Sequence, residues 1–238
     1  MHKTLTAAAG AMTLLAALTL AAPAQAGTWH HHDEGTAKLS VLHGVPGLTV
    51  DVWVDGKRAL DNFTPGKVAG PLNVPDGDHK IAITGANATS AANPVIGPVT
   101  VDLEAGQDYT AVAHLAANGK PTATLFTNDT STSPDGKGKL TVRHVAAAPA
   151  VDVLAGRTAV VKELTNPHQK TLTLKAGTVS ASVAAAGTTS PLIGPANVRI
   201  TEGKNTIVYA WGSLAAKNLK VAVQVVDSAS QGDECDDE

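Results

Sequence analysis

Short apolar stretches that alternate with polar positions recur along most of this chain. The alternation runs through residues 39–43 and 50–54, and Asp55-Gly56, a dipeptide that favours a tight hairpin turn, precedes the stretch 57–63. Turn signals return about every 8–12 residues, the spacing typical of a β-sandwich. No helical period is sustained after residue 26, so the pattern predicts an all-β protein.

The same segments occur twice in the chain. Lys38–His43 recurs as Lys139–His144, and Val50–Val52 recurs as Val151–Val153, both at an offset of 101. The tripeptide Ile96-Gly97-Pro98 recurs at an offset of 97, so small loop deletions separate the copies. Two copies of this length indicate a tandem duplication, because solenoid repeats are shorter and more numerous.

We therefore expect two tandem antiparallel β-sandwiches, over residues 38–129 and 139–227. The stretch 130–138 is polar and contains Pro and Gly, which predicts a linker. In the first copy, the pattern that leads from Leu103 to Tyr109 resembles the tyrosine corner of immunoglobulin-like sandwiches. Tyr109 is thus predicted to be structural.

Two motifs carry a family resemblance. Both copies read His-x(6)-Val-Asp-Val, from His43 and from His144, and the first continues to a Leu-x-x-Gly-x-x-Tyr-Thr motif. The chain resembles the bacterial secreted domain of unknown function family 4397 over both copies. The resemblance implies an immunoglobulin-like or transthyretin-like sandwich on an exported or cell-surface protein, with no established activity. The family's loop Asp is missing after both histidines, so no ligand role for it is carried over.

The N-terminal segment has the pattern of an export signal. A basic start is followed by the apolar run 5–22, and Ala24–Ala26 is a small-x-small site, so residues 1–26 are predicted to be a signal peptide cleaved near Ala26-Gly27. A membrane anchor is the alternative, but no charged stop-transfer cluster follows. We expect a secreted protein with a flexible, His-rich N-terminus over 27–37.

Composition supports folded domains outside the membrane. Hydrophobic residues make up 43% of the 238 positions and charged residues 16%, which excludes a disordered chain, and a net charge of −3 argues against nucleic acid as the main partner. The acidic stretch 228–238 is predicted to be a disordered tail. Its Cys235 is the single cysteine, so no intrachain disulfide can form. The thiol could join two chains, but Glu234 and Asp236 beside it disfavour the thiolate, and we expect a monomer.

Histidines are the main candidates for chemistry. The pairs His43/Asp51 and His144/Asp152 could share a proton or bind a metal, but two ligands are fewer than zinc requires. We expect instead that each Asp caps backbone N–H groups with the His packed beside it. A second set, His30, His31 and His32, is a candidate site for Cu²⁺, Ni²⁺ or Zn²⁺, with adventitious binding as the alternative because a mobile terminus holds no preorganised site.

Lysines and aspartates at strand ends raise a further possibility. Lys38 and Lys139 open the first strands, and Asp129 and Asp227 close the last ones, an arrangement that could form isopeptide bonds. Ordinary exposed side chains at strand ends are the simpler interpretation.

No motif of a catalytic site is found, and no cofactor is expected. The favoured function is a secreted, non-enzymatic binding or structural module of the cell envelope or exterior, with an envelope component, a protein or a glycan as partner. A small-molecule or metal-binding carrier is the alternative, and a hydrolase is less favoured. A concave polar pocket between the domains, or at the His43 and His144 strand ends, would favour the carrier.

Overall fold

The computed structural model describes residues 35–228, and these residues form strands but no helix. Accordingly, the described part of the chain has no apolar helix long enough to cross a membrane. The first repeat contains β1 (Thr36–His43), β2 (Val50–Val54), β3 (Lys57–Phe63), β4 (Val68–Pro75), β5 (Gly77–Gly85), β6 (Ile96–Leu103), β7 (Asp108–Leu115) and β8 (Pro121–Thr127). The second contains β9 (Lys137–Ala147), β10 (Val151–Ala155), β11 (Thr158–Leu164), β12 (Gln169–Lys175), β13 (Gly177–Ala185), β14 (Pro191–Ile200), β15 (Lys204–Ser213) and β16 (Lys220–Asp227).

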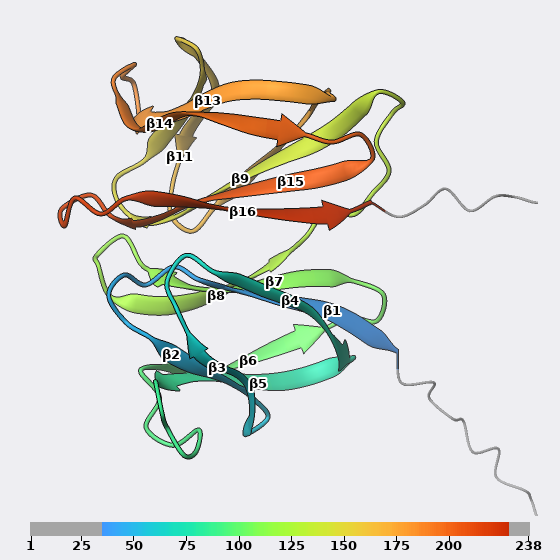
Figure 1. Cartoon of the computed structure of the whole chain (residues 1–238), viewed down its shortest axis with the longest axis vertical. Helices are drawn as coiled ribbons and strands as arrows, with labels where there is room; N and C mark the ends of the chain where they lie inside the picture. Colours follow the sequence, from blue (N-terminus) through green and yellow to red (C-terminus); the bar gives the residue numbers. More distant parts are fainter. Residues whose placement is uncertain (1–34, 229–238) are drawn as a thin grey trace, which may run out of the picture. The chain divides into compact units, whose positions relative to one another are not determined.

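Each repeat is a sandwich of two four-stranded sheets (Figure 1). The sheet orders are β4-β1-β7-β8 and β3-β2-β5-β6 in the first repeat, and β12-β9-β15-β16 and β11-β10-β13-β14 in the second. The prediction of an all-β protein with two tandem β-sandwiches is confirmed. Paired strands are antiparallel except for β1 with β7 and β9 with β15, which are parallel because the chain passes through the other sheet between them. Constant-type immunoglobulin sandwiches have sheets of four and three strands, so this arrangement favours the transthyretin-like alternative.

Local signals explain some strands better than others. Asp55 and Gly56 join β2 to β3 with φ values of 50° and 75°, the left-handed conformation that a tight hairpin of this type requires. The strands β4 and β6 have few buried positions, so the alternation that predicts strands is weak there. Strand β9 begins at Lys137 and takes in the last residues of the expected linker.

The repeated Ile-Gly-Pro motif forms a bulge in β6 and in β14. The pairing of β5 with β6 shifts between Ile81 and Ile83, and Gly97 has a φ of 88°. A Cβ atom on Gly97 would lie 2.7 Å from the carbonyl oxygen of Ile81, and one on Gly194 would lie 2.9 Å from that of Ala181. Only glycine fits such a close backbone approach, which explains why the motif occurs in both copies.

Each sandwich has its own apolar core, and a third cluster joins the two repeats. The first core includes Leu39 and Leu103, and the second includes Leu140 and Ile200. The third, which we call the junction cluster, contains Leu42, Val112 and Phe126 of the first repeat and Val145, Ile207, Tyr209, Trp211, Ala222 and Val226 of the second. The described residues therefore belong to one compact unit, a feature that the expected linker does not predict.

Candidate functional site

The two repeated histidines fasten the loop that follows the first strand of each repeat. The Nε2 atom of His43 lies 2.7 Å from the carbonyl oxygen of Leu48, and that of His144 lies 3.0 Å from the carbonyl oxygen of Pro149. In both rings, Nδ1 accepts a hydrogen bond from the backbone N–H two residues further on. Burial lowers the pKa of both histidines, so each ring is neutral at neutral pH, with its proton on Nε2.

The two repeated aspartates each bind backbone N–H groups of two separate segments. Asp51 accepts hydrogen bonds from the N–H of Asn62 at 2.8 Å and of Ala88 at 3.2 Å. Asp152 makes the corresponding bonds in the second repeat at 2.8 and 2.9 Å, and these bonds lower its pKa. The His and Asp of each pair thus bind backbone groups. No group of three His, Cys, Asp or Glu side chains within residues 35–228 could hold a metal ion.

Tyr109 makes the contact of a tyrosine corner. Its hydroxyl oxygen accepts a hydrogen bond of 3.2 Å from the backbone N–H of Glu104. In the second repeat, the hydroxyl of Thr206 donates to the carbonyl oxygen of Arg199 at 3.0 Å. The two repeats therefore secure this corner with different side chains.

Several sequence-predicted features lie outside the described residues. These are the signal peptide, the histidines His30, His31 and His32, and the tail with Cys235. The metal site predicted at the three histidines therefore stays a prediction.

Sequence reasoning missed the network around Arg143 in β9. This side chain is 0% exposed. Its Nη1 donates to the hydroxyl of Tyr209 at 2.7 Å, its Nη2 to Asn128 Oδ1 at 2.8 Å, and its Nε to Gln169 Oε1 at 2.7 Å. Leu42 occupies the equivalent position of the first repeat, so a charged residue that breaks the internal repeat was the available signal.

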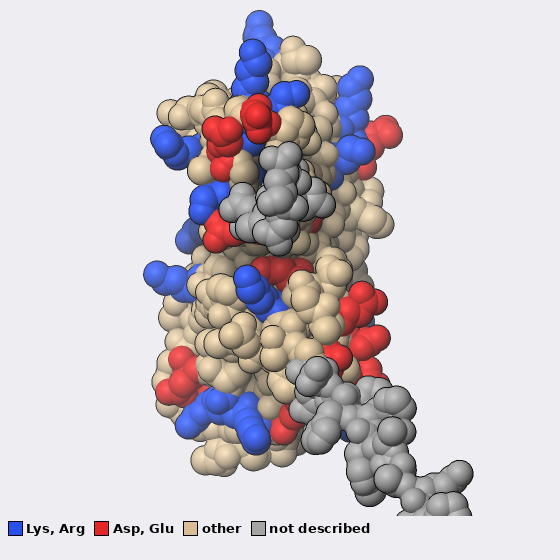
Figure 2. Space-filling model, turned by 90° about the vertical axis from the view of Figure 1, so that its right-hand side faces the viewer, with Lys and Arg blue, Asp and Glu red and all other residues tan. Residues whose placement is uncertain are grey.

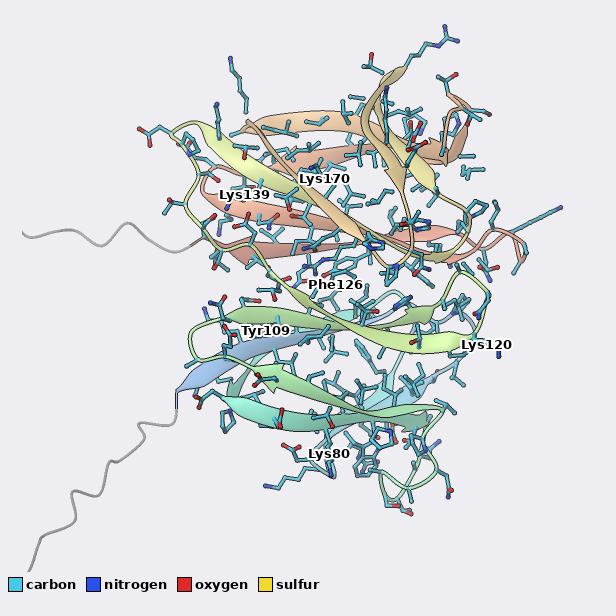
Figure 3. All side chains as sticks on the ribbon, turned by 180° about the vertical axis from the view of Figure 1, so that it is seen from behind. Lys80, Tyr109, Lys120, Phe126, Lys139 and Lys170 are labelled. Atoms are coloured by element: carbon cyan, nitrogen blue, oxygen red, sulfur yellow. The ribbon has the colours of Figure 1, made fainter. Side chains whose placement is uncertain are left out.

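Arg143 joins the two repeats because Asn128 belongs to the first. Its guanidinium also lies 4.5 Å from the ring centre of Phe126, which Figure 3 shows between the two sandwiches. Asn128 in turn donates to Asp108 at 2.5 Å, and burial raises the pKa of the Asp108 carboxyl. A buried guanidinium is costly unless its donors find partners, so this network favours one geometry of the junction.

Loops from both repeats meet at one end of the junction. The side-chain nitrogen of Asn166 donates to the carbonyl oxygens of Leu115 at 2.8 Å and Ala146 at 2.6 Å, one in each repeat. The Trp211 ring packs so closely on Gly66 that a Cβ there would lie 2.8 Å from it. We call the loops that meet here the composite loop surface; they are residues 64–67, 116–120 and 165–168.

A polar pocket of about 250 Å³ lies between the repeats, nearer the start of β1. Its lining includes Lys38, Asp108, Gln224 and Asp227. Asp108 and Gln224 are both buried and also take part in the network around Arg143. On the face drawn in Figure 2, basic and acidic side chains are interspersed, so that face carries no charge of a single sign.

Both strand-end aspartates form ion pairs with lysines. The Nζ atom of Lys139 lies 2.6 Å from Asp129 Oδ1, and Asp227 pairs with Lys204 instead of a lysine that opens a first strand. Of the strand-end lysines and aspartates considered for isopeptide bonds, only Lys139 and Asp129 lie close to each other.

A protein-family model matches part of the chain. No curated protein matches the chain. Residues 37–154 match the family model of a domain of unknown function, DUF4397. This stretch covers the first sandwich and ends in β10, so the match supports the resemblance of the first repeat to this family.

Proposed function

We propose that this protein is a non-enzymatic binding or structural module of the cell exterior or envelope, in which the two sandwiches act as one rigid body. The observation that carries the proposal is the buried junction, where Arg143 of one repeat donates to Asn128 of the other at 2.8 Å. A fixed junction presents loops of both repeats as one surface, so that little conformational entropy is lost on binding. The engagement of the repeated His and Asp side chains with backbone groups favours this role over hydrolysis.

The composite loop surface is the proposed contact region. It presents two exposed lysines, Lys67 and Lys120, from different loops of the first repeat. Figure 3 shows Lys120 at one end of the first-repeat sheet that faces the second sandwich. Two cations at the rim favour a partner that carries anionic groups, such as an acidic envelope glycan or protein.

Charge reversal tests this assignment. Binding of the chain to isolated cell-envelope material and to a purified anionic cell-wall glycan would be measured by co-sedimentation. The double variant Lys67→Glu and Lys120→Glu is expected to bind about tenfold more weakly. The control Lys80→Glu changes an exposed lysine away from this surface (Figure 3) and should bind like the unchanged chain. No binding by the unchanged chain, or an equal loss in the control, would refute the proposal.

A small-molecule carrier is the second candidate, and the polar pocket between the repeats favours it. The pocket, at about 250 Å³, is a little smaller than most ligand sites, which span about 300–1,000 Å³. Saturation-transfer NMR with monosaccharides and free amino acids would reveal a ligand. Lys38→Ala at the pocket should weaken its signal, whereas Lys57→Ala, at an exposed site in β3, should not. If none of the monosaccharides or amino acids gives a saturation-transfer signal, the carrier function is contradicted.

A further inference from the structure

The second sandwich contains an apolar pocket at the edge where β14 and β16 face each other. Its volume is about 150 Å³, whereas the matching space of the first sandwich measures about 20 Å³. The lining is almost wholly aliphatic, with Val142, Val183 and Val208 on its walls and Ser182 and Asn197 as its polar members. Water gains few hydrogen bonds in such a space.

The strand registers show which side chains the second repeat has lost. In the first repeat Ile81 pairs with Val99, and in the second the equivalent pair is Ala181 with Ala196. These two positions lie on adjacent strands of one sheet, and both have become smaller. Two facing positions of the other sheet change in the opposite sense, from alanines in the first repeat to Val208 and Val221, and they recover only part of the volume.

The edge is also more open in the second repeat. In the first sandwich β6 packs against β8, whereas β14 packs against β9 and β15. Val221 and Val223 of β16 line the pocket, yet they remain 40% and 53% exposed. Leu125, which corresponds to Val223, is partly covered and packs against the first core. The apolar side chains around this pocket thus lack the covering that the first repeat provides for itself.

We propose that the second sandwich binds an aliphatic group of a small molecule in this pocket. The first repeat indicates what fits, because the side chains of Ile81 and Val99 fill the equivalent space there. The occupant is therefore a saturated carbon chain or branch of a few atoms, with its polar end left at the rim near the exposed Asn197. This site lies within one sandwich and is independent of the composite loop surface proposed above as the contact region.

A series of straight-chain alcohols from butanol to decanol tests the proposal with the full chain. Affinity is expected to rise about fourfold with each added methylene and then to level off once the pocket is full. In methyl NMR spectra, the shifts should map to Val183, Val208 and Val223. Sedimentation equilibrium would be run in parallel to detect self-association.

Variants that copy the first repeat sharpen the test. Ala181→Ile with Ala196→Val should fill the pocket, keep the fold and weaken alcohol binding at least about tenfold. The matched control, Thr178→Ile with Thr100→Val, places comparable apolar side chains at exposed strand positions outside the pocket and should leave binding unchanged. The proposal is overturned if the unchanged chain binds no alcohol, or if the filled variant binds alcohol as well as the unchanged chain. It is also overturned if the unchanged chain binds no alcohol but forms a dimer that the filled variant does not form, because the pocket would then be part of a dimer interface. If the filled variant does not fold, Ala196→Val alone, with a smaller loss of affinity, decides the question.

Discussion

At the scale of single residues, equivalent positions of the two repeats have diverged into different roles. Leu42 packs in the junction cluster, while Arg143 at the same strand position is the centre of a buried hydrogen-bond network. Both side chains face the other repeat. The same strand position therefore contributes an apolar contact to the junction from the first repeat and the centre of its polar network from the second.

Replacement of the buried guanidinium tests this role. Arg143→Leu introduces the residue of the first repeat and leaves Asn128 and Asp108 buried without their cationic neighbour. We expect the free energy of unfolding, measured by urea denaturation, to fall by about 2–4 kcal/mol. The control Arg157→Leu, at an exposed turn position, should stay within about 0.5 kcal/mol of the unchanged chain. Equal effects of the two substitutions would contradict the assignment.

Buried histidines predict that stability declines in mild acid. Burial lowers the pKa of His43, His114 and His144 in the folded protein. In the unfolded chain these groups titrate at about pH 6.5, so below that pH the unfolded state binds more protons than the folded state. The stabilisation is complete above about pH 6.5 and is lost as the pH falls through that value.

One histidine acts in the opposite direction. Burial disfavours the charged form of His79, but its hydrogen bonds to Asp55 and Pro75 prevail and raise its pKa, so its contribution is lost as the pH rises. Because His43, His114 and His144 are all more completely buried than His79, we expect the denaturant midpoint to fall between about pH 7 and pH 5. A double variant, His43→Gln with His144→Gln, should have a shallower pH dependence. An unchanged slope in that variant would show that these rings are not responsible.

At the scale of elements, the aspartates join strands where the sheet ladder is interrupted. The register of β2 with β3 shifts between Val50 and Val52, and Asn62 on the bulged strand has a φ of 51°. Asp51 accepts the hydrogen bond of this residue and ties the loop after β5 to the same place. A carboxylate is suited to this task because each of its two oxygens accepts a bond.

An amide at this position would have only one accepting oxygen. Asp51→Asn is therefore expected to reduce the free energy of unfolding by about 1–3 kcal/mol, because one buried N–H loses its acceptor. Asp152→Asn should lower the melting temperature for the same reason. Asp102→Asn, at an exposed site in β6, serves as the control for loss of charge. An unchanged melting temperature in both test variants would show that the two aspartates do not stabilise the segments they join.

At the scale of the whole described molecule, the junction couples two sandwiches that each have a core. Phe126 belongs to the junction cluster and lies under the Arg143 guanidinium. Both sandwich cores can persist without the Phe126 side chain, because Phe126 belongs to neither core. Its loss should therefore affect the coupling more than either sandwich alone.

Calorimetry can measure this coupling. The unchanged chain should unfold in one transition, with calorimetric and van't Hoff enthalpies in agreement. Phe126→Ala should split or broaden the transition and reduce the stability of the junction by about 3 kcal/mol. Leu192→Ala, at an exposed position in β14, should keep a single transition. Two separate transitions in the unchanged chain would show that the sandwiches unfold independently.

The sequence by itself determined the all-β class and the duplication. Apolar alternation and the Asp55-Gly56 turn depend on local backbone geometry, which neighbouring residues specify. The recurrence of His43 and Asp51 as His144 and Asp152 also marked positions that later proved to bind loop backbone. Which loops they bind could not be read from spacing, because the partners lie in other strands.

Only the tertiary structure decided what the outward faces of the sheets do. Leu42, Phe126 and Tyr209 form one cluster because two sheets from different repeats pack together, and a strand pattern does not reveal the partner of a face. The pocket of the second sandwich has the same origin, since Ala181 and Ala196 are adjacent in one sheet and leave a space only because that sheet packs against the other. Volume and buried charge depend on contacts between distant segments, and these arise when the chain has folded.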